Sequence, residues 1–237
     1  MRRNQQPLGY GVLKNQIAPV FRGQKIVYMI KNIYPISNTK LKMLVVFDDG
    51  RTIAVVKSAL KEYNVKEGDN LSFEKVSEIA GEGEAHEAFL KAADALGRSP
   101  KSEKEIRTAL KDKGYSKAAA DVAVEKLTGY GYLSDEDYAK TYIEHYSKKW
   151  GRKKLVYELV QTKGLPSDVA NEIVYGALSD EDELRLALEL AGKFLKKKNG
   201  KDNLKQKCLA FLASRGIDFQ TALKATETLI KEEDDYA

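Results

Sequence analysis

The sequence predicts a mainly α-helical protein, in which tandem three-helix repeats form an elongated, curved solenoid preceded by a small β-rich module. One observation behind this prediction is a change of hydrophobic period, from that of strands to that of helices, near residue 80. The other is internal similarity, because one short pattern recurs three times in the helical part. The copies occupy residues 105–115, 155–165 and 208–217.

The β-rich module is expected over residues 26–80. Its strands are short runs rich in β-branched and aromatic residues. These runs are residues 26–30, 44–47 and 52–56. Asp48, Asp49 and Gly50 separate the last two runs, and an Asp-Gly pair there predicts a hairpin because glycine tolerates positive φ. Residues 1–25 show no clear period, and we expect them to be a mobile extension.

The helical repeat domain is expected over residues 81–237. Helix starts are marked by capping residues, such as Ser102 followed three positions later by Glu105. Apolar residues recur with helical spacing. The clearest such face is Leu184, Ala187, Leu188, Ala191 and Leu195. The three repeats are expected at roughly 83–130, 131–180 and 181–232.

Each copy of the recurring pattern is an amphipathic helix that ends in a basic residue, a glycine and an apolar residue. Gly114, Gly164 and Gly216 are 50 and then 52 residues apart. Glycine can adopt the left-handed conformation that ends a helix, and the basic residue meets the negative end of the helix dipole. The period predicts helical units that bury their apolar faces by stacking on their neighbours.

These segments together resemble the RecX family of regulatory proteins. The resemblance covers residues 83–232 in the right order and spacing, and residues 47–50 are similar to a weaker N-terminal module of some members. The residues that carry it are Ser102, Glu105, Ile106, Leu110, Lys113 and Gly114, then 129–139, 151–155, 158–159, 163–165 and 211–217. The resemblance implies a protein without enzymatic activity that binds the RecA filament and inhibits its ATPase and strand exchange. It thereby implies a role in recombination, DNA repair and the SOS response.

Two clusters of basic residues are candidate contacts to DNA or to an acidic partner, because clustered Lys and Arg attract phosphate. The first surrounds the only tryptophan, which could stack on bases or pack into the core. It consists of Lys148, Lys149, Trp150, Arg152, Lys153 and Lys154. The second could equally serve helix capping and solubility. It consists of Lys193, Lys196, Lys197, Lys198, Lys201, Lys205 and Lys207. Arg215 is a third candidate, although its place at a helix end favours capping.

Charge is divided unevenly along the chain. Residues 1–80 hold 13 Lys and Arg against 7 Asp and Glu, whereas residues 81–237 hold 27 against 28. This modest positive balance permits contact with nucleic acid without requiring it. Tyr138, Tyr142 and Tyr146 share one helical face, and that spacing favours packing against a core over a stacking platform.

Enzymatic and metal-binding sites are not expected. His86, His145 and Cys208 are too few and too scattered for a zinc site of usual spacing, and no phosphate-binding glycine-rich motif is found. We expect no cofactor, no membrane segment, a cytoplasmic location that suits a single cysteine, and a monomer. The alternative hypothesis is a sequence-tolerant DNA-binding helical module that acts alone, and a plain helical scaffold is a third.

Overall fold

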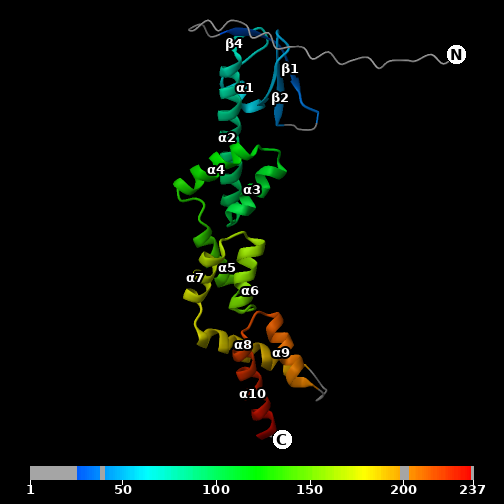
Figure 1. Ribbon diagram of the computed structural model, residues 1–237, viewed down its shortest axis with the longest axis vertical. Helices are drawn as coiled ribbons and strands as arrows, with labels where there is room; N and C mark the ends of the chain where they lie inside the picture. The colour runs from blue at the N-terminus through cyan, green and yellow to red at the C-terminus, as the bar shows by residue number, and fades with distance from the viewer. Residues whose placement is uncertain (1–25, 38–40, 198–202, 236–237) are drawn as a thin grey trace, which may run out of the picture.

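The computed structural model describes residues 26–37, 41–197 and 203–235, with side chains as far as Lys231. It is an elongated chain of units with the sheet at one end and α10 at the other (Figure 1). The strands are β1 (Val27–Pro35), β2 (Lys42–Phe47), β3 (Thr52–Val56) and β4 (Asn70–Ser72). The first helices are α1 (Lys57–Glu62), α2 (Phe73–Arg98), α3 (Glu103–Asp112) and α4 (Lys117–Gly129). They are followed by α5 (Asp135–Tyr146), α6 (Arg152–Tyr157), the π-helical η1 (Glu158–Thr162) and α7 (Ser167–Ala177). The last helices are α8 (Asp180–Lys196), α9 (Leu204–Ser214) and α10 (Phe219–Asp235). The mainly helical fold behind a small sheet is confirmed, and the expected extension at 1–25 lies outside the described residues.

The N-terminal module is a four-stranded antiparallel sheet in the order β3-β2-β1-β4. The predicted hairpin joins β2 to β3, with Gly50 at φ +87° and its amide donating to the carbonyl of Phe47 over 3.1 Å. Ile30, Val45 and Phe47 are fully or almost fully buried on the face that packs against helices. The hairpin prediction is therefore confirmed, whereas α1 had no recognised signal in the sequence.

Helix α2 belongs to both the sheet module and the first repeat (Figure 1). The expected division at residues 80/81 falls inside it. Val76 and Ile79 in its first half are buried in the core of the sheet module, and Ala88 and Ala92 in its second half are buried in the core of the first repeat. A single rigid helix thus connects the two units.

Two carboxylates of α2 hold the sheet module against the first repeat. Glu84 pairs with Lys42 of β2 over 2.7 Å and also accepts from the amide of Ser116, which caps α4. Glu87 accepts from the hydroxyl of Ser58 and, over 3.3 Å, from that of Tyr115. Each carboxylate therefore contacts both units, which fixes their relative orientation.

The recurring pattern forms the second helix of each repeat, namely α3, the α6–η1 pair and α9. Its apolar positions are buried in all three copies. They are Ile106, Leu110 and Tyr115, then Leu155, Leu159 and Leu165, then Cys208, Leu212 and Ile217. Gly114, Gly164 and Gly216 have φ of +87°, +86° and +79°, as expected for glycines that end helices. The prediction that these glycines close equivalent helices is confirmed.

The second copy contains one residue more than the first between its capped start and its glycine. In the first and third copies the residue after the glycine donates its amide five residues back, from Tyr115 to Leu110 and from Ile217 to Leu212. In the second copy Leu165 donates six residues back, to Leu159. The wider π-helical turns of η1 absorb the extra residue, so the buried leucines keep their register.

Candidate partner interface and the joints between repeats

The repeats have separate apolar cores and meet through polar helix ends. The buried residues divide into one cluster for the sheet module and one for each repeat. The second helices of the three repeats lie one after another along the molecule. The N-terminus of each of the first two lies against the C-terminus of the second helix in the next repeat. We call the contact of the start of α3 with the end of η1 the first joint. The second joint is the set of contacts that the start of α6 makes with α8, with the end of α9 and with the turn before α10.

The first joint is built by the capped start of α3. Ser102 and Glu105 form the predicted capping box, and the Ser102 hydroxyl donates to the carbonyl of Lys163 over 2.8 Å. Lys104 Nζ donates to the carbonyl of Gln161 over 2.9 Å, and Lys163 Nζ lies 2.6 Å from Glu105 Oε1. The carbonyls at the end of η1 thus receive donors from the preceding repeat.

The charge of Glu105 is stabilised within this joint. Burial disfavours the carboxylate, but hydrogen bonds from Lys163 and from the amide of Ser102 outweigh it and lower the pKa of Glu105. The neighbouring Asp135 accepts from the amide of Glu103, but its burial raises its pKa. The charged carboxylate of Glu105 therefore stabilises the folded protein, whereas the charged carboxylate of Asp135 destabilises it.

We expect the contribution of Glu105 to stability to depend on pH. A depressed folded-state pKa gives stability that is complete above the unfolded pKa of about 4.3 and is lost as pH falls through the folded value. Urea unfolding of wild type and Glu105→Gln from pH 7 to pH 3 should show a lower midpoint for the variant at pH 7 and convergence at acidic pH. Glu105→Gln also removes a charge that helps to raise the pKa of Asp135, which offsets a small part of the loss. Glu136→Gln removes an exposed ion pair and is the control. A difference in urea midpoint between wild type and Glu105→Gln that stays the same from pH 7 to pH 3 would contradict this role.

The second joint depends on close approach of two backbones. The amide of Gly151, the N-cap of α6, donates to the carbonyl of Arg215 over 2.8 Å. The amide of Lys153 donates to the carbonyl of Gly216 over 3.2 Å. A Cβ at either glycine would overlap atoms of the other repeat, with Gly216 facing the backbone of Lys154. Glycine is therefore required on both sides of this joint.

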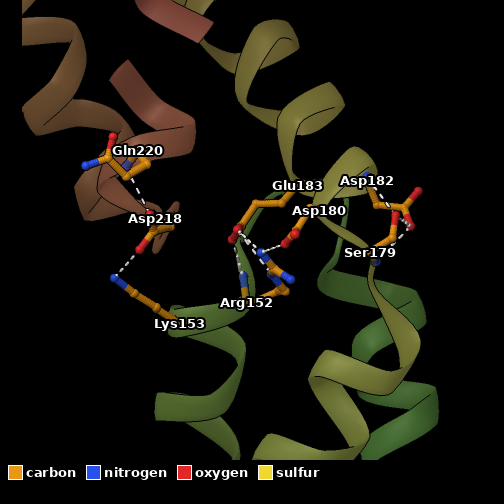
Figure 2. A network of polar contacts seen from close by, with 8 residues as sticks. All are labelled: Arg152, Lys153, Ser179, Asp180, Asp182, Glu183, Asp218 and Gln220. Carbon is orange, nitrogen blue, oxygen red and sulfur yellow. Dashed lines mark hydrogen bonds and ion pairs between the residues drawn. The ribbon is translucent and has the colours of Figure 1, made fainter. Parts of the chain in front are cut away.

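Arg152 and Glu183 form a buried ion pair at the second joint (Figure 2). The side chain of Glu183, from α8, is 1% exposed and that of Arg152 is 11% exposed. Glu183 Oε1 accepts from the amide of Arg152 over 3.0 Å, and Oε2 accepts from its Nη2 and Nε over 2.7 and 3.1 Å. Asp180 also contacts Arg152 Nη2 over 2.6 Å. These contacts outweigh the effect of burial and raise the pKa of Arg152.

The first basic cluster is divided by the structure between this joint and the surface. Arg152 lies in the joint, and Lys153 pairs across it with Asp218 over 2.6 Å (Figure 2). Lys148 and Lys149 are exposed, and within the described residues neither side chain has an ion pair. Lys154 Nζ lies 5.3 Å from the centre of the Trp150 ring.

Trp150, in the loop after α5, is the last member of an aromatic row that begins on that helix. Its ring stacks on Tyr146 with centroids 4.5 Å apart, and Tyr146 contacts Tyr142 at the same distance. Tyr138, Tyr142, Tyr146 and Trp150 are partly buried and pack against the core of the second repeat. The prediction that the tyrosine stripe packs against a core is confirmed, and Trp150 packs against the same core.

The second basic cluster contains paired and unpaired lysines. Lys193 pairs with Glu189, and Lys205 with Glu227 over 2.7 Å. Lys207 on α9 also has an interaction. Lys196 and Lys197, at the end of α8, are exposed and have no ion pair within the described residues. Lys198 and Lys201 lie outside those residues.

Arg215 lies at the end of α9, where its carbonyl takes part in the second joint. Its guanidinium is 5.2 Å from the centre of the Phe211 ring. The sequence alone does not identify Glu183 as a partner of the first cluster, because acidic residues are common in the first turn of a helix and four of them begin α8. A signal was present, since Glu183 lies four residues before Ala187 on the buried face.

Among residues 26–37, 41–197 and 203–235, no three His, Cys, Asp or Glu side chains gather as metal ligands would. None of the helices described there is both long and apolar enough to cross a membrane. Cys208 is buried, and burial raises the pKa of its thiol.

Comparison with known proteins assigns the repeats to a family. Residues 88–127 match the model of the first three-helix domain of RecX, and residues 134–173 match that of the second. Regulatory protein RecX of Clostridium perfringens (strain 13 / Type A) is 30% identical over 190 residues, which cover 78% of this chain and 89% of that protein. The chain belongs to the RecX family. Regulatory protein RecX of Bacillus subtilis (strain 168) is 28% identical over 191 residues, which cover 79% of this chain and 72% of the relative.

Solved RecX structures share the fold. A crystal structure of regulatory protein RecX superimposes with a TM-score of 0.59 at 20% identity, covering 83% of this chain and 98% of the other. RecX from Lactobacillus salivarius gives a TM-score of 0.53 at 20% identity, covering 64% and 97%. The stacked helical units are therefore a shared architecture of RecX proteins.

Proposed function

We propose that this chain binds the RecA recombinase filament in the bacterial cytoplasm and inhibits its ATPase and strand-exchange activities. It acts by binding and not by catalysis, as a monomer, and so controls recombination and DNA repair. The observation that carries the proposal is the succession of similar units in a chain that belongs to the RecX family. A filament repeats its subunits along its length, so a partner built of repeats can make similar contacts with several of them.

Exposed lysines in corresponding loops support a contact with such a partner. The loop between the first and second helices carries Lys148 and Lys149 in the second repeat. In the third repeat Lys196 ends α8 and Lys197 begins the corresponding loop. Because these lysines have no ion pair within the described residues, they can approach DNA phosphates without first breaking an ion pair. DNA is the secondary contact in this proposal.

The proposed contact set is narrower than the two clusters read from the sequence. It is centred on Lys148, Lys149, Lys154, Lys196 and Lys197. Arg152 and Lys153 are engaged by carboxylates of the third repeat, so their charges are largely compensated at the second joint. Removing Arg152 would leave the buried Glu183 carboxylate without its partner, and Lys153 is already paired, so neither residue is suitable for testing a direct contact.

The variant Lys148→Ala/Lys149→Ala/Lys154→Ala should inhibit RecA less than wild type does, because it removes three positive charges beside the second joint. Its binding to bare single-stranded DNA should also depend less on salt, with a log–log slope smaller by up to about 2. RecA ATP hydrolysis and salt-titrated fluorescence anisotropy measure the two effects. Circular dichroism checks that the fold is kept.

Lys57→Ala/Lys61→Ala/Lys66→Ala is the matched control, since it removes three exposed lysines from the sheet module. Equal inhibition by wild type and both variants would remove the lysines beside the second joint from the interface.

The alternative function is a DNA-binding module that acts alone, which the same exposed lysines favour. Tight, salt-sensitive DNA binding without any effect on RecA would support that alternative.

A further inference from the structure

The orientation of the third repeat relative to the second depends on few contacts. Helices α7 and α8 are joined only by Leu178 and Ser179. The apolar residues on the two sides belong to separate clusters, so no shared core among the described residues fixes the angle between the repeats. What crosses the boundary is the second joint, in which the Arg152–Glu183 ion pair is more buried than the Lys153–Asp218 pair.

This pair has the geometry of a directional contact. Both oxygens of Glu183 are occupied, one by the amide that begins α6 and the other by the guanidinium of Arg152. The carboxylate therefore fixes both the axis of α6 and the side chain that projects from it. Tyr175 of α7 adds a further constraint, because the guanidinium lies 4.8 Å from the centre of its ring.

Stability alone does not account for a buried ion pair. Desolvation of two charges offsets much of their attraction, and apolar residues of similar size often give equal or greater stability. Removal of one partner, by contrast, leaves a buried charge without compensation. An ion pair differs from an apolar contact in that it is satisfied in a narrow range of orientations.

We propose that the Arg152–Glu183 pair is a positioning element that fixes the angle between the second and third repeats and thereby the spacing of their exposed lysine loops. Arg152 acts here through geometry, as it aligns Lys148 and Lys149 of one repeat with Lys196 and Lys197 of the next. This role rests on the proposed function, since the fixed spacing serves the partner. The effect of the pair on the angle between the two repeats can be measured without any partner protein.

The test compares variants that differ in what they leave buried. Arg152→Met/Glu183→Leu removes the directional contact without leaving an unpaired charge. Because it also leaves the Arg152 amide without its acceptor, we expect it to stay folded with a urea midpoint moderately below that of the wild type. Glu183→Gln keeps the shape but loses the charge. Lys153→Ala is the matched control, because it removes an exposed ion pair that crosses the same joint, and such pairs contribute little.

Distances between spin labels report the angle between the repeats. One label pair spans the joint, at Glu144→Cys of α5 and Lys224→Cys of α10, and a second pair at Glu144→Cys and Glu172→Cys lies within the second repeat. Glu144, Glu172 and Lys224 are exposed, and buried Cys208 stays in place. We expect Arg152→Met/Glu183→Leu and, more weakly, Glu183→Gln to broaden the distribution across the joint only. Lys153→Ala should leave both distributions unchanged.

The same unlabelled variants are then assayed for inhibition of RecA ATP hydrolysis. Arg152→Met/Glu183→Leu should need about tenfold more protein for half-inhibition than Lys153→Ala does. An unchanged distance distribution in the double variant would overturn the positioning role. A broadened distribution with undiminished inhibition would overturn its importance for the partner. Failure of the wild type itself to inhibit RecA would overturn the proposed function, and with it the claim that the lysine loops are aligned for RecA. The distances between the spin labels would then still decide whether the Arg152–Glu183 pair fixes the angle between the repeats.

Discussion

Replacing Gly216 with alanine is expected to lower the free energy of unfolding by about 3 kcal/mol. Its φ of +79° costs an L-residue roughly 1–2 kcal/mol. The new Cβ would also overlap the backbone of Lys154, which forces apart the hydrogen bonds from Gly151 to Arg215 and from Lys153 to Gly216. Each such bond contributes about 1 kcal/mol. Urea unfolding followed by circular dichroism measures the loss.

Gly114→Ala is the control that separates backbone strain from the joint. Gly114 has a φ of +87°, but a Cβ there would meet nothing within 4 Å, since no repeat stacks on that turn. We expect a loss of only about 1–2 kcal/mol. Gly164→Ala should fall between the two, because its Cβ would meet only the side chain of Lys104. Equal losses of unfolding free energy in Gly114→Ala and Gly216→Ala would show that the close contact at the second joint adds no cost beyond the strain of a positive φ.

Replacing Gly83 with alanine is expected to cost about 2 kcal/mol, since the new methyl group would overlap the side chain of Ala59 in α1. The clash would push the sheet module away from α2 and weaken the contacts of Glu84 with Lys42 and of Glu87 with Ser58. Thermal unfolding followed by circular dichroism measures the effect as a lower midpoint.

Gly81→Ala, in the same helix, has the opposite expected sign. A Cβ at Gly81 would meet nothing within 4 Å, and alanine is a better helix former than glycine by up to about 1 kcal/mol. The midpoint should therefore rise slightly. A loss at Gly81 as large as that at Gly83 would show that α2 requires glycine for its backbone and not for the contact with Ala59.

The repeat glycines and the hairpin could be predicted because their conformations are local. Positive φ at Gly50, Gly114, Gly164 and Gly216 follows from the chain on either side of each glycine. The capping box of Ser102 and Glu105 is equally local, since its two residues are one turn apart. Such features need no knowledge of what packs against them.

The joints could not be predicted because their partners are distant in the sequence. Glu183 is 31 residues from Arg152, and Ser102 is 61 residues from Lys163. Without those partners, the basic run at 148–154 is indistinguishable from a surface patch. The structure divides it into residues that hold repeats together and residues that remain exposed.

The continuity of α2 was missed for a related reason. Its first half packs on a sheet and its second half on helices, so its buried side chains follow two different partners along one helix. Gly81 and Gly83 in its middle also favour a break by local propensity. The close contact with Ala59 explains one of these glycines, and nothing in the structure explains the other.

The most direct test of the account is single-stranded-DNA-dependent ATP hydrolysis by RecA, with this chain titrated below one molecule per RecA subunit. We expect strong inhibition at these ratios, because one rigidly joined set of repeats contacts several subunits of the filament. Undiminished hydrolysis up to equal amounts of the two proteins, with this chain shown to be folded, would contradict it.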